Sequence, residues 1–139
     1  MKKKIIAVDF DGVLHSFSSG WQGARTISDL PTDGAVEWLK HLIRRPHLPV
    51  RCCPEYHIKV VIYSARLYHW GGKRAIKKWL WLWGLTKQEI SMLGFVRQKP
   101  VCQFILDDRV VCFRGKFPSD HEIINFRPWH GQSIWGDDE

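Results

Sequence analysis

The sequence predicts an α/β protein with a mainly parallel central sheet and helices on both faces. Short runs of apolar residues alternate along the chain with segments in which apolar residues recur at helical spacing. The apolar runs lack polar alternation, which is typical of strands covered on both faces of a parallel sheet. Strands that alternate with helices imply right-handed crossovers and layers of helices on the sheet.

The first half of the chain contains two predicted strands and one predicted helix. The apolar run Ile5 to Val8 is the first strand. Pro31 to Gly34 supplies capping residues for a helix that ends near Arg45, because apolar residues recur at helical spacing behind it. A proline-rich loop then leads to the second strand, Ile58 to Tyr63.

The second half continues the alternation. Gly71 and Gly72 open a helix that Gly84 ends, and Thr86 to Glu89 has the spacing of a capping box for a short helix through Met92. The third predicted strand is Val101 to Leu106. Beyond it we predict an edge strand at Val110 to Phe113, a turn at Phe117 to Ser119 that leads into a single helical turn, and a frayed end from Gly136 onward.

Composition indicates one globular domain, residues 1–139. An apolar fraction of 45% with 13% aromatic residues is enough for a core in a chain of 139 residues. The net charge of +7 favours anionic partners such as phosphates or nucleic acid, although a solvated lysine surface explains the same charge.

Localisation is predicted to be cytoplasmic, with no membrane partner and a monomer or weak dimer as the assembly. The apolar run behind Lys2 to Lys4 is too short for a signal peptide or a membrane span. The four cysteines form no C-x-x-C pair and are interpreted as reduced thiols.

Polar residues follow each predicted strand. Asp9 and Asp11 follow the first strand, Ser64 the second, and Asp107 and Asp108 the third. Parallel topology brings these strand ends together at one edge of the sheet, where ligands bind in such folds. Clustered carboxylates repel one another and therefore need a cation, and hard oxygen ligands suit Mg²⁺.

This set of residues predicts phosphoryl transfer. One carboxylate beside a metal can attack phosphorus, and a second can move protons, for which Asp11 is well placed two residues beyond Asp9. Ser64 and Lys99 are candidate donors to the phosphoryl oxygens.

The four motifs together resemble those of the haloacid dehalogenase (HAD) superfamily. Their order along the chain matches the family's, and they span about two-thirds of the sequence: Asp9 to Leu14, Ile62 to Ser64, Lys99, and Leu106 to Asp108. The resemblance is to small phage and bacterial members without a cap domain, and it implies a Rossmann-like three-layer α/β/α fold.

The resemblance also implies roles. Asp9 would be the nucleophile, Asp11 the general acid and base, and Ser64 and Lys99 the phosphate anchors. Mg²⁺ would be held by Asp9, the backbone carbonyl of Asp11, and the pair Asp107 and Asp108. Which of that pair touches the metal stays open.

Several neighbouring residues have open roles. Lys87 or Lys116 could replace Lys99 at the site. Arg66 and Arg109 each adjoin a motif and are expected to pair with a second phosphate or with the carboxylates, and for Arg109 the carboxylates are favoured. His15 is expected to be a local hydrogen-bonding residue, with a contact to substrate as the alternative. Trp21 lies where the family carries a flap, and it is expected to pack there or to stack on a base or sugar.

The predicted function is Mg²⁺-dependent hydrolysis of a phosphomonoester through an aspartyl-phosphate. Basic charge and aromatic residues mildly favour a nucleotide or a nucleic-acid 3′-phosphate as substrate, by similarity to polynucleotide 3′-phosphatases. The alternative is a non-catalytic protein of the same fold that binds nucleic acid or another anionic partner. A phospho-accepting receiver domain is disfavoured. In receivers an acidic pair follows the first strand and a lone acceptor aspartate follows the third. This chain has the reverse order, and no aspartate lies between Asp33 and Asp107.

Overall fold

The structure is a computed structural model that describes residues 2–45 and 55–131. The predicted loop from Pro46 to Pro54 and the predicted frayed end from Gly136 lie outside the described residues. Within the described part, no helix is long and apolar enough to cross a membrane.

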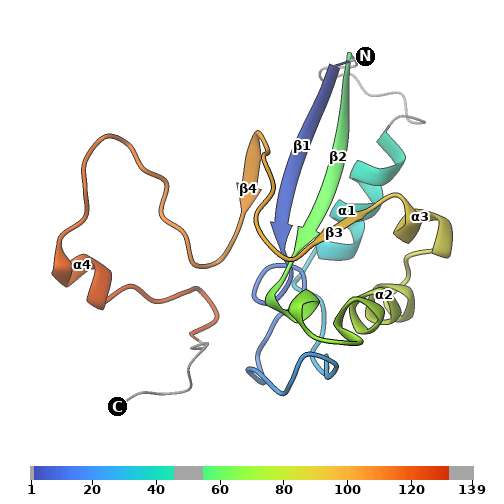
Figure 1. The fold of residues 1–139 in the computed structure, drawn as a ribbon, viewed down its shortest axis with the longest axis horizontal. Coiled ribbons are helices and arrows are strands. Elements are labelled where there is room, and N and C mark those ends of the chain that lie inside the picture. The colour runs from blue at the N-terminus through green and yellow to red at the C-terminus, as the bar shows by residue number, and fades with distance from the viewer. Residues whose placement is uncertain (1, 46–54, 132–139) are drawn as a thin grey trace.

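A four-stranded, all-parallel sheet forms the centre of the fold (Figure 1). Its strands are β1 (Lys2–Asp9), β2 (Tyr56–Tyr63), β3 (Gly94–Val96) and β4 (Phe104–Leu106), in the order β3-β2-β1-β4. β1 pairs with β2 along its whole length, from Lys2 opposite Tyr56 to Asp9 opposite Tyr63. The α/β class and the parallel sheet of a Rossmann-like fold are therefore confirmed.

The hydrophobic core joins one face of β1 and β2 to three helices. These are α1 (Ala35–Arg44), α2 (Gly72–Leu82) and α3 (Lys87–Ser91). Val8 and Ile62 are register partners whose side chains are buried in this core. Its helical members share positions on the inward faces of the helices: Leu39, Leu42, Ile43, Ile76, Trp79, Leu80 and Ile90.

The helix boundaries agree with the sequence prediction. Thr86 and Glu89 form the expected capping box, with each side chain bound to the other's backbone N–H. Gly84 follows α2 with φ 114°, a conformation that favours glycine. α1 begins at Ala35, directly after the predicted capping residues, but its N-cap is Gly34 at φ 81° and no side chain caps it.

Two strand predictions need correction, and one strand was missed. β3 was not predicted, because a three-residue strand that begins with a glycine carries no readable periodicity. β4 was predicted at Val101 to Leu106 but begins only at Phe104. At Gln103 the side-chain oxygen accepts the Ile5 N–H at 2.7 Å, in the place of a backbone carbonyl oxygen. The predicted edge strand Val110 to Phe113 is wrong, since this segment is exposed and pairs with no strand of the described chain.

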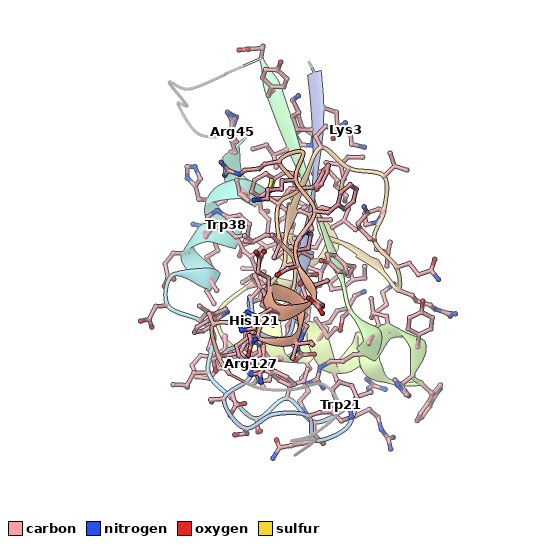
Figure 2. All side chains as sticks on the ribbon, turned by 90° about the vertical axis from the view of Figure 1, so that its left-hand side faces the viewer. Lys3, Trp21, Trp38, Arg45, His121 and Arg127 are labelled. Atoms are coloured by element: carbon pink, nitrogen blue, oxygen red, sulfur yellow. The ribbon has the colours of Figure 1, made fainter. Side chains whose placement is uncertain are left out.

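The long excursion after β4 that carries α4 stands away from the sheet (Figure 1). The predicted helical turn exists as α4 (Asp120–Ile124), where Ser119 accepts the Glu122 N–H at 3.2 Å. None of the residues of α4 is buried. Figure 2 shows Lys3 and Arg45 at one end of the molecule and Trp21 at the opposite end, beyond the carboxyl ends of β1 and β2.

A close backbone approach joins the 3-10 helix η2 (Ala65–Tyr68) to the start of α2. A Cβ at Gly72 would overlap the carbonyl oxygen of Arg66. Glycine is therefore required by space at the first position of this helix, although alanine has the better helix propensity by about 1 kcal/mol.

We predict that Gly72→Ala lowers the free energy of unfolding by about 2 kcal/mol or more, because backbone atoms must move to admit the methyl group. Urea denaturation measures the change. Lys73→Ala, at the exposed next position, is the matched control and should change stability by less than about 0.5 kcal/mol. A stabilised Gly72→Ala protein would show that Arg66 and Gly72 are not in contact.

Candidate functional site

Strand order brings three of the predicted site residues to one edge of the sheet. Asp9 ends β1, Ser64 follows β2, and Asp107 follows β4. Because β1 pairs in parallel with both β2 and β4, these positions are close to one another in register. They line one cavity of about 500 Å³, whose complete lining is Asp9, Asp11, Phe17, Trp21, Ser64, Ala65, His69, Asp107, Arg109 and Val110.

A tight turn after β1 positions Asp11. The carbonyl oxygen of Phe10 accepts three backbone N–H groups, the last from His15 at 3.0 Å. Gly12 has φ 84°, and a Cβ there would overlap both Asp108 and His130. The D-x-D-G sequence therefore forms a turn whose glycine allows close contact with the second acidic motif.

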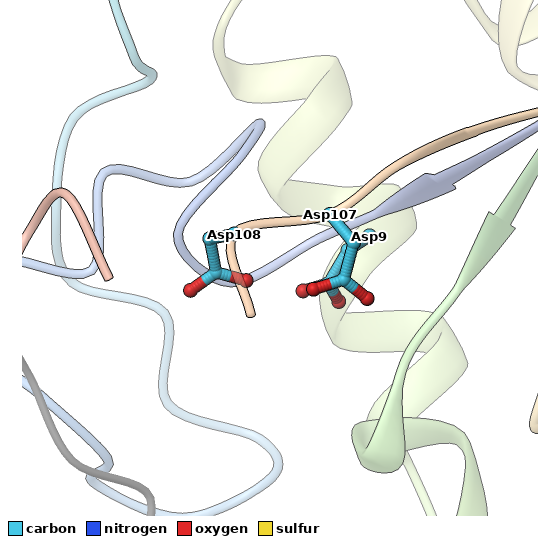
Figure 3. Close-up of side chains that lie close together, drawn as sticks. All are labelled: Asp9, Asp107 and Asp108. Carbon is cyan, nitrogen blue, oxygen red and sulfur yellow. The ribbon is translucent and has the colours of Figure 1, made fainter. Parts of the chain in front are cut away.

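Three carboxylates from two strand ends converge at this edge (Figure 3). Asp9, Asp107 and Asp108 each offer an oxygen atom, and these atoms lie within 4.8 Å of one another. The side chain of Asp108 is only 1% exposed, and its Oδ1 has no hydrogen-bond partner within the described chain. An orphaned, buried oxygen among other carboxylate oxygens fits a hard divalent cation such as Mg²⁺.

The electrostatics of the acidic cluster indicate that Asp9 and Asp108 share a proton, which Asp9 carries. Burial, a hydrogen bond to Asp108 and the charges of the neighbouring aspartates raise the pKa of Asp9 to about 10. Burial also acts to raise the pKa of Asp108, but hydrogen bonds from Asp9 and His130 outweigh it and lower that pKa. A bound cation would remove the need for this proton.

Asp107 is held by neighbours from two segments. The Tyr63 hydroxyl donates to its Oδ2, and the Arg109 backbone N–H donates to its Oδ1 at 2.8 Å. Burial and the bond to Asp107 raise the pKa of Tyr63 well above its usual range, so the phenol remains a donor. Tyr63 is a site residue that the sequence analysis placed only within a strand motif.

Two residues near the end of the described chain also reach the site. His130 Nε2 contacts Asp108 Oδ2, and the indole N–H of Trp129 donates to the Gly12 carbonyl at 2.5 Å. The sequence analysis missed both residues. Their distance from the motifs along the chain left no local signal that could have found them.

Asp11 is bound by two buried side chains. Arg66 Nε donates to Asp11 Oδ2 at 2.8 Å, and His15 Nδ1 lies 2.8 Å from Asp11 Oδ1. Arg66 was expected to pair with a second phosphate or with the carboxylates, and it pairs with the carboxylate of Asp11. His15 is a local hydrogen-bonding residue, as expected. The described metal cluster does not include the Asp11 side chain.

Lys99 is not brought to the cavity. Its side chain is exposed, and in the described part of the chain it forms no ion pair with the three carboxylates. Lys87 and Lys116, the alternatives, are exposed as well. Arg109 lines the cavity instead, with Nε at 3.7 Å from Asp108 Oδ2, as expected for a partner of the acidic cluster.

Trp21 borders the cavity, as expected for a flap residue. Its ring lies 4.8 Å from the Arg66 guanidinium and 6.3 Å from the His69 ring. The residue is 45% exposed, so part of its surface is accessible to a ligand.

We predict that the metal-free protein loses stability relative to Asp9→Asn as the pH rises from about 4 to about 10. The unfolded chain releases the Asp9 proton near its ordinary pKa of 3.8, whereas the folded protein keeps it up to about 10. Within this window the slope reaches about 1.4 kcal/mol per pH unit for one proton.

Urea denaturation in chelator at several pH values measures this slope in the wild type and in Asp9→Asn. Asp120→Asn, which changes an exposed carboxyl group of α4, should keep the slope of the wild type. Equal slopes in the wild type and Asp9→Asn would refute the shared proton.

We predict that the three carboxylates bind Mg²⁺ and that His130→Ala weakens this binding about 10- to 100-fold, because His130 orients Asp108 by a direct contact. Isothermal titration with Mg²⁺ measures the affinity. His121→Ala in exposed α4 serves as the control and should bind as the wild type does. Unchanged affinity of His130→Ala would mean that Asp108 needs no such support.

Comparison of the chain with family models, with curated proteins and with solved structures finds no match, so the site is interpreted from its own geometry.

Proposed function

We propose that the protein is a Mg²⁺-dependent phosphomonoester hydrolase that acts through an aspartyl-phosphate on Asp9. One observation carries this proposal: oxygens of Asp9, Asp107 and Asp108 lie within 4.8 Å of one another. Asp9 lines the same cavity as Ser64 and Asp11, so a phosphate there would meet a nucleophile, a hydroxyl group and a second carboxylate.

Asp9, Asp107 and Asp108 would hold the cation. When bound, Mg²⁺ supplies positive charge that offsets the carboxylates and the phosphoryl oxygens. The backbone carbonyl of Asp11 completes the ligand set in this proposal.

The Asp9 carboxylate attacks phosphorus, and the bond between phosphorus and the leaving oxygen breaks. For this step Asp11 must leave its ion pair with Arg66 and carry a proton, which it gives to that oxygen, so that the leaving group departs as an alcohol. A water molecule then attacks the aspartyl-phosphate and loses a proton to Asp11, and the products are inorganic phosphate and free Asp9.

Ser64 is the proposed phosphate anchor from β2. Its Oγ accepts the Arg66 N–H at 3.1 Å, which leaves the hydroxyl proton available for a phosphoryl oxygen. Lys99 is the second anchor by the family resemblance, and a move of the segment between β3 and β4 would be needed to bring it in. Arg109 already lines the cavity and can supply positive charge there.

The same arrangement supports assignment to the capless HAD phosphatases. The motif residues follow β1, β2 and β4 in the family's order. Between Ser64 and Lys99 the chain forms η2, α2, α3 and β3, and these elements belong to the sheet and its helical layer. That stretch leaves no room for a cap domain.

A non-catalytic binding protein is the second candidate, and one observation favours it. Arg66 and His15 both bind Asp11, so the oxygens of its carboxylate already have hydrogen-bond partners before any substrate binds. A proton donor must be freed from these partners in each cycle. A protein that only binds anions has no such requirement.

Phosphate release from an aryl phosphate tests the proposal. We expect release that depends on Mg²⁺, stops with chelator, and falls by at least about a thousandfold in Asp9→Asn, because the nucleophile is lost. Asp120→Asn is the matched control and should retain full activity. If a folded protein binds Mg²⁺ but releases no phosphate from any monoester, the binding protein replaces the enzyme.

A further inference from the structure

A second, strongly basic hollow lies beside α2. We name it the basic groove. It has a volume of about 840 Å³, and its lining is Arg25, Trp70, Gly71, Lys73, Arg74, Ala75, Lys77 and Lys78. Five of these residues are cationic and none is acidic.

The pattern of α2 explains the concentration of charge. Ile76, Trp79 and Leu80 are buried, so the basic positions fall on the outward face of the helix. Lys73 and Lys77, and likewise Arg74 and Lys78, are four residues apart, and such like-charged neighbours repel each other. In the described chain none of the five cations pairs with a carboxylate. An anionic ligand would relieve this repulsion.

An aromatic side chain stands among these cations. Trp70 is 87% exposed, and the Arg25 guanidinium lies 5.8 Å from its ring. Cations that contact phosphates, together with an exposed ring on which bases stack, are the elements of single-stranded nucleic-acid sites. An acidic peptide would use the charges but leave the exposed indole without a partner.

The basic groove and the Asp9 cavity adjoin. Trp21 lines the cavity and Arg25 lines the groove, four residues apart on one loop. His69 lines the cavity and Trp70, the next residue, lines the groove. The rings of Trp21 and His69 lie 6.3 Å apart, so the side of the cavity that neighbours the groove along the chain is aromatic.

We propose that the basic groove binds the backbone of a single-stranded nucleic acid and leads its terminal phosphate to Asp9. The binding part stands by itself, whereas delivery to Asp9 rests on the proposed function. The net reaction would be a terminal phosphomonoester plus water giving a terminal hydroxyl group plus inorganic phosphate. The substrate class is therefore an end-phosphorylated polynucleotide.

Binding is tested in the Asp9→Asn background, which removes turnover. Fluorescence anisotropy with a short labelled oligodeoxythymidine compares Arg74→Glu/Lys78→Glu with Lys3→Glu/Arg114→Glu, which reverses two exposed cations outside both the groove and the Asp9 cavity. We expect about tenfold or greater weakening and a shallower salt dependence only in the groove variant. Trp70→Ala should weaken binding roughly tenfold through lost stacking.

Equal weakening by the two double variants would overturn the groove as the binding site. Duplex DNA or polyglutamate that binds as tightly as the oligonucleotide would overturn the assignment to single strands. Circular dichroism and thermal melting of each variant verify that it is folded.

Turnover tests the delivery of the terminal phosphate. Oligonucleotides with a 3′- or a 5′-phosphate are compared with an aryl phosphate, using the groove variant with Asp9 intact. We expect kcat/KM to fall about tenfold on one of the oligonucleotides, mainly through KM, and to stay within about twofold on the aryl phosphate. Equal losses on both kinds of substrate would overturn the delivery.

The two proposals fail in distinguishable ways. Oligonucleotide binding that depends on the groove, without phosphate release from any substrate, would refute the hydrolase and keep the binding site. Hydrolysis of the aryl phosphate with groove-independent oligonucleotide binding and turnover would keep the hydrolase and refute the inference.

Discussion

The buried guanidinium of Arg66 is the interaction on which the site depends. Its side chain is fully buried, and its three nitrogens bind Asp11 and the carbonyl oxygens of Gly23, Ala24 and Thr26. A buried cation is tolerated only when it is paired and its donors are satisfied. Arg66 thus joins the turn after β1, the loop that carries Trp21, and η2 after β2. Loss of Asp11 would strand a buried charge, which typically costs about 3–5 kcal/mol, so its substitutions alter stability as well as chemistry.

The second constraint is the crowding of carboxylates that a parallel sheet imposes. β1 and β4 point the same way, so the acidic residues that follow them meet at one edge. This crowding raises the pKa of Asp9, which keeps its proton, and Tyr63 and His130 supply donors to the neighbouring carboxylates. The same donors hold the carboxylates close together, and under the proposed function a bound cation would relieve their mutual repulsion and gain binding free energy from it.

Much of the fold and the centre of the site could be predicted from local signals. The apolar run before Asp9 and the capping box at Thr86 each identify an element by chemistry that acts over a few residues. The ends of β1 and β4 then follow from parallel topology. β3 could not be found, because three residues carry no readable periodicity. The apolar run Val110 to Phe113 was wrongly predicted as a strand, because its residues stay exposed.

The partners of the site residues could not be predicted. Arg66 binds Asp11 and His130 contacts Asp108 through tertiary contacts, which a single sequence does not encode locally. For Lys99 the family spacing predicted an anchor, whereas the structure leaves the side chain outside the cavity.

The contact of Trp129 with Gly12 and that of His130 with Asp108 have a consequence for biosynthesis. Gly12 leaves the ribosome early, whereas its partner Trp129 lies 117 residues later. Elements fold from the N-terminus as the chain is made, so the sheet can form while the last contacts are still absent. The acidic site is then completed only after nearly the whole described chain has emerged. A nascent chain would therefore carry the sheet before His130 supports Asp108, and the three carboxylates would reach their final arrangement only after residue 130 has been made.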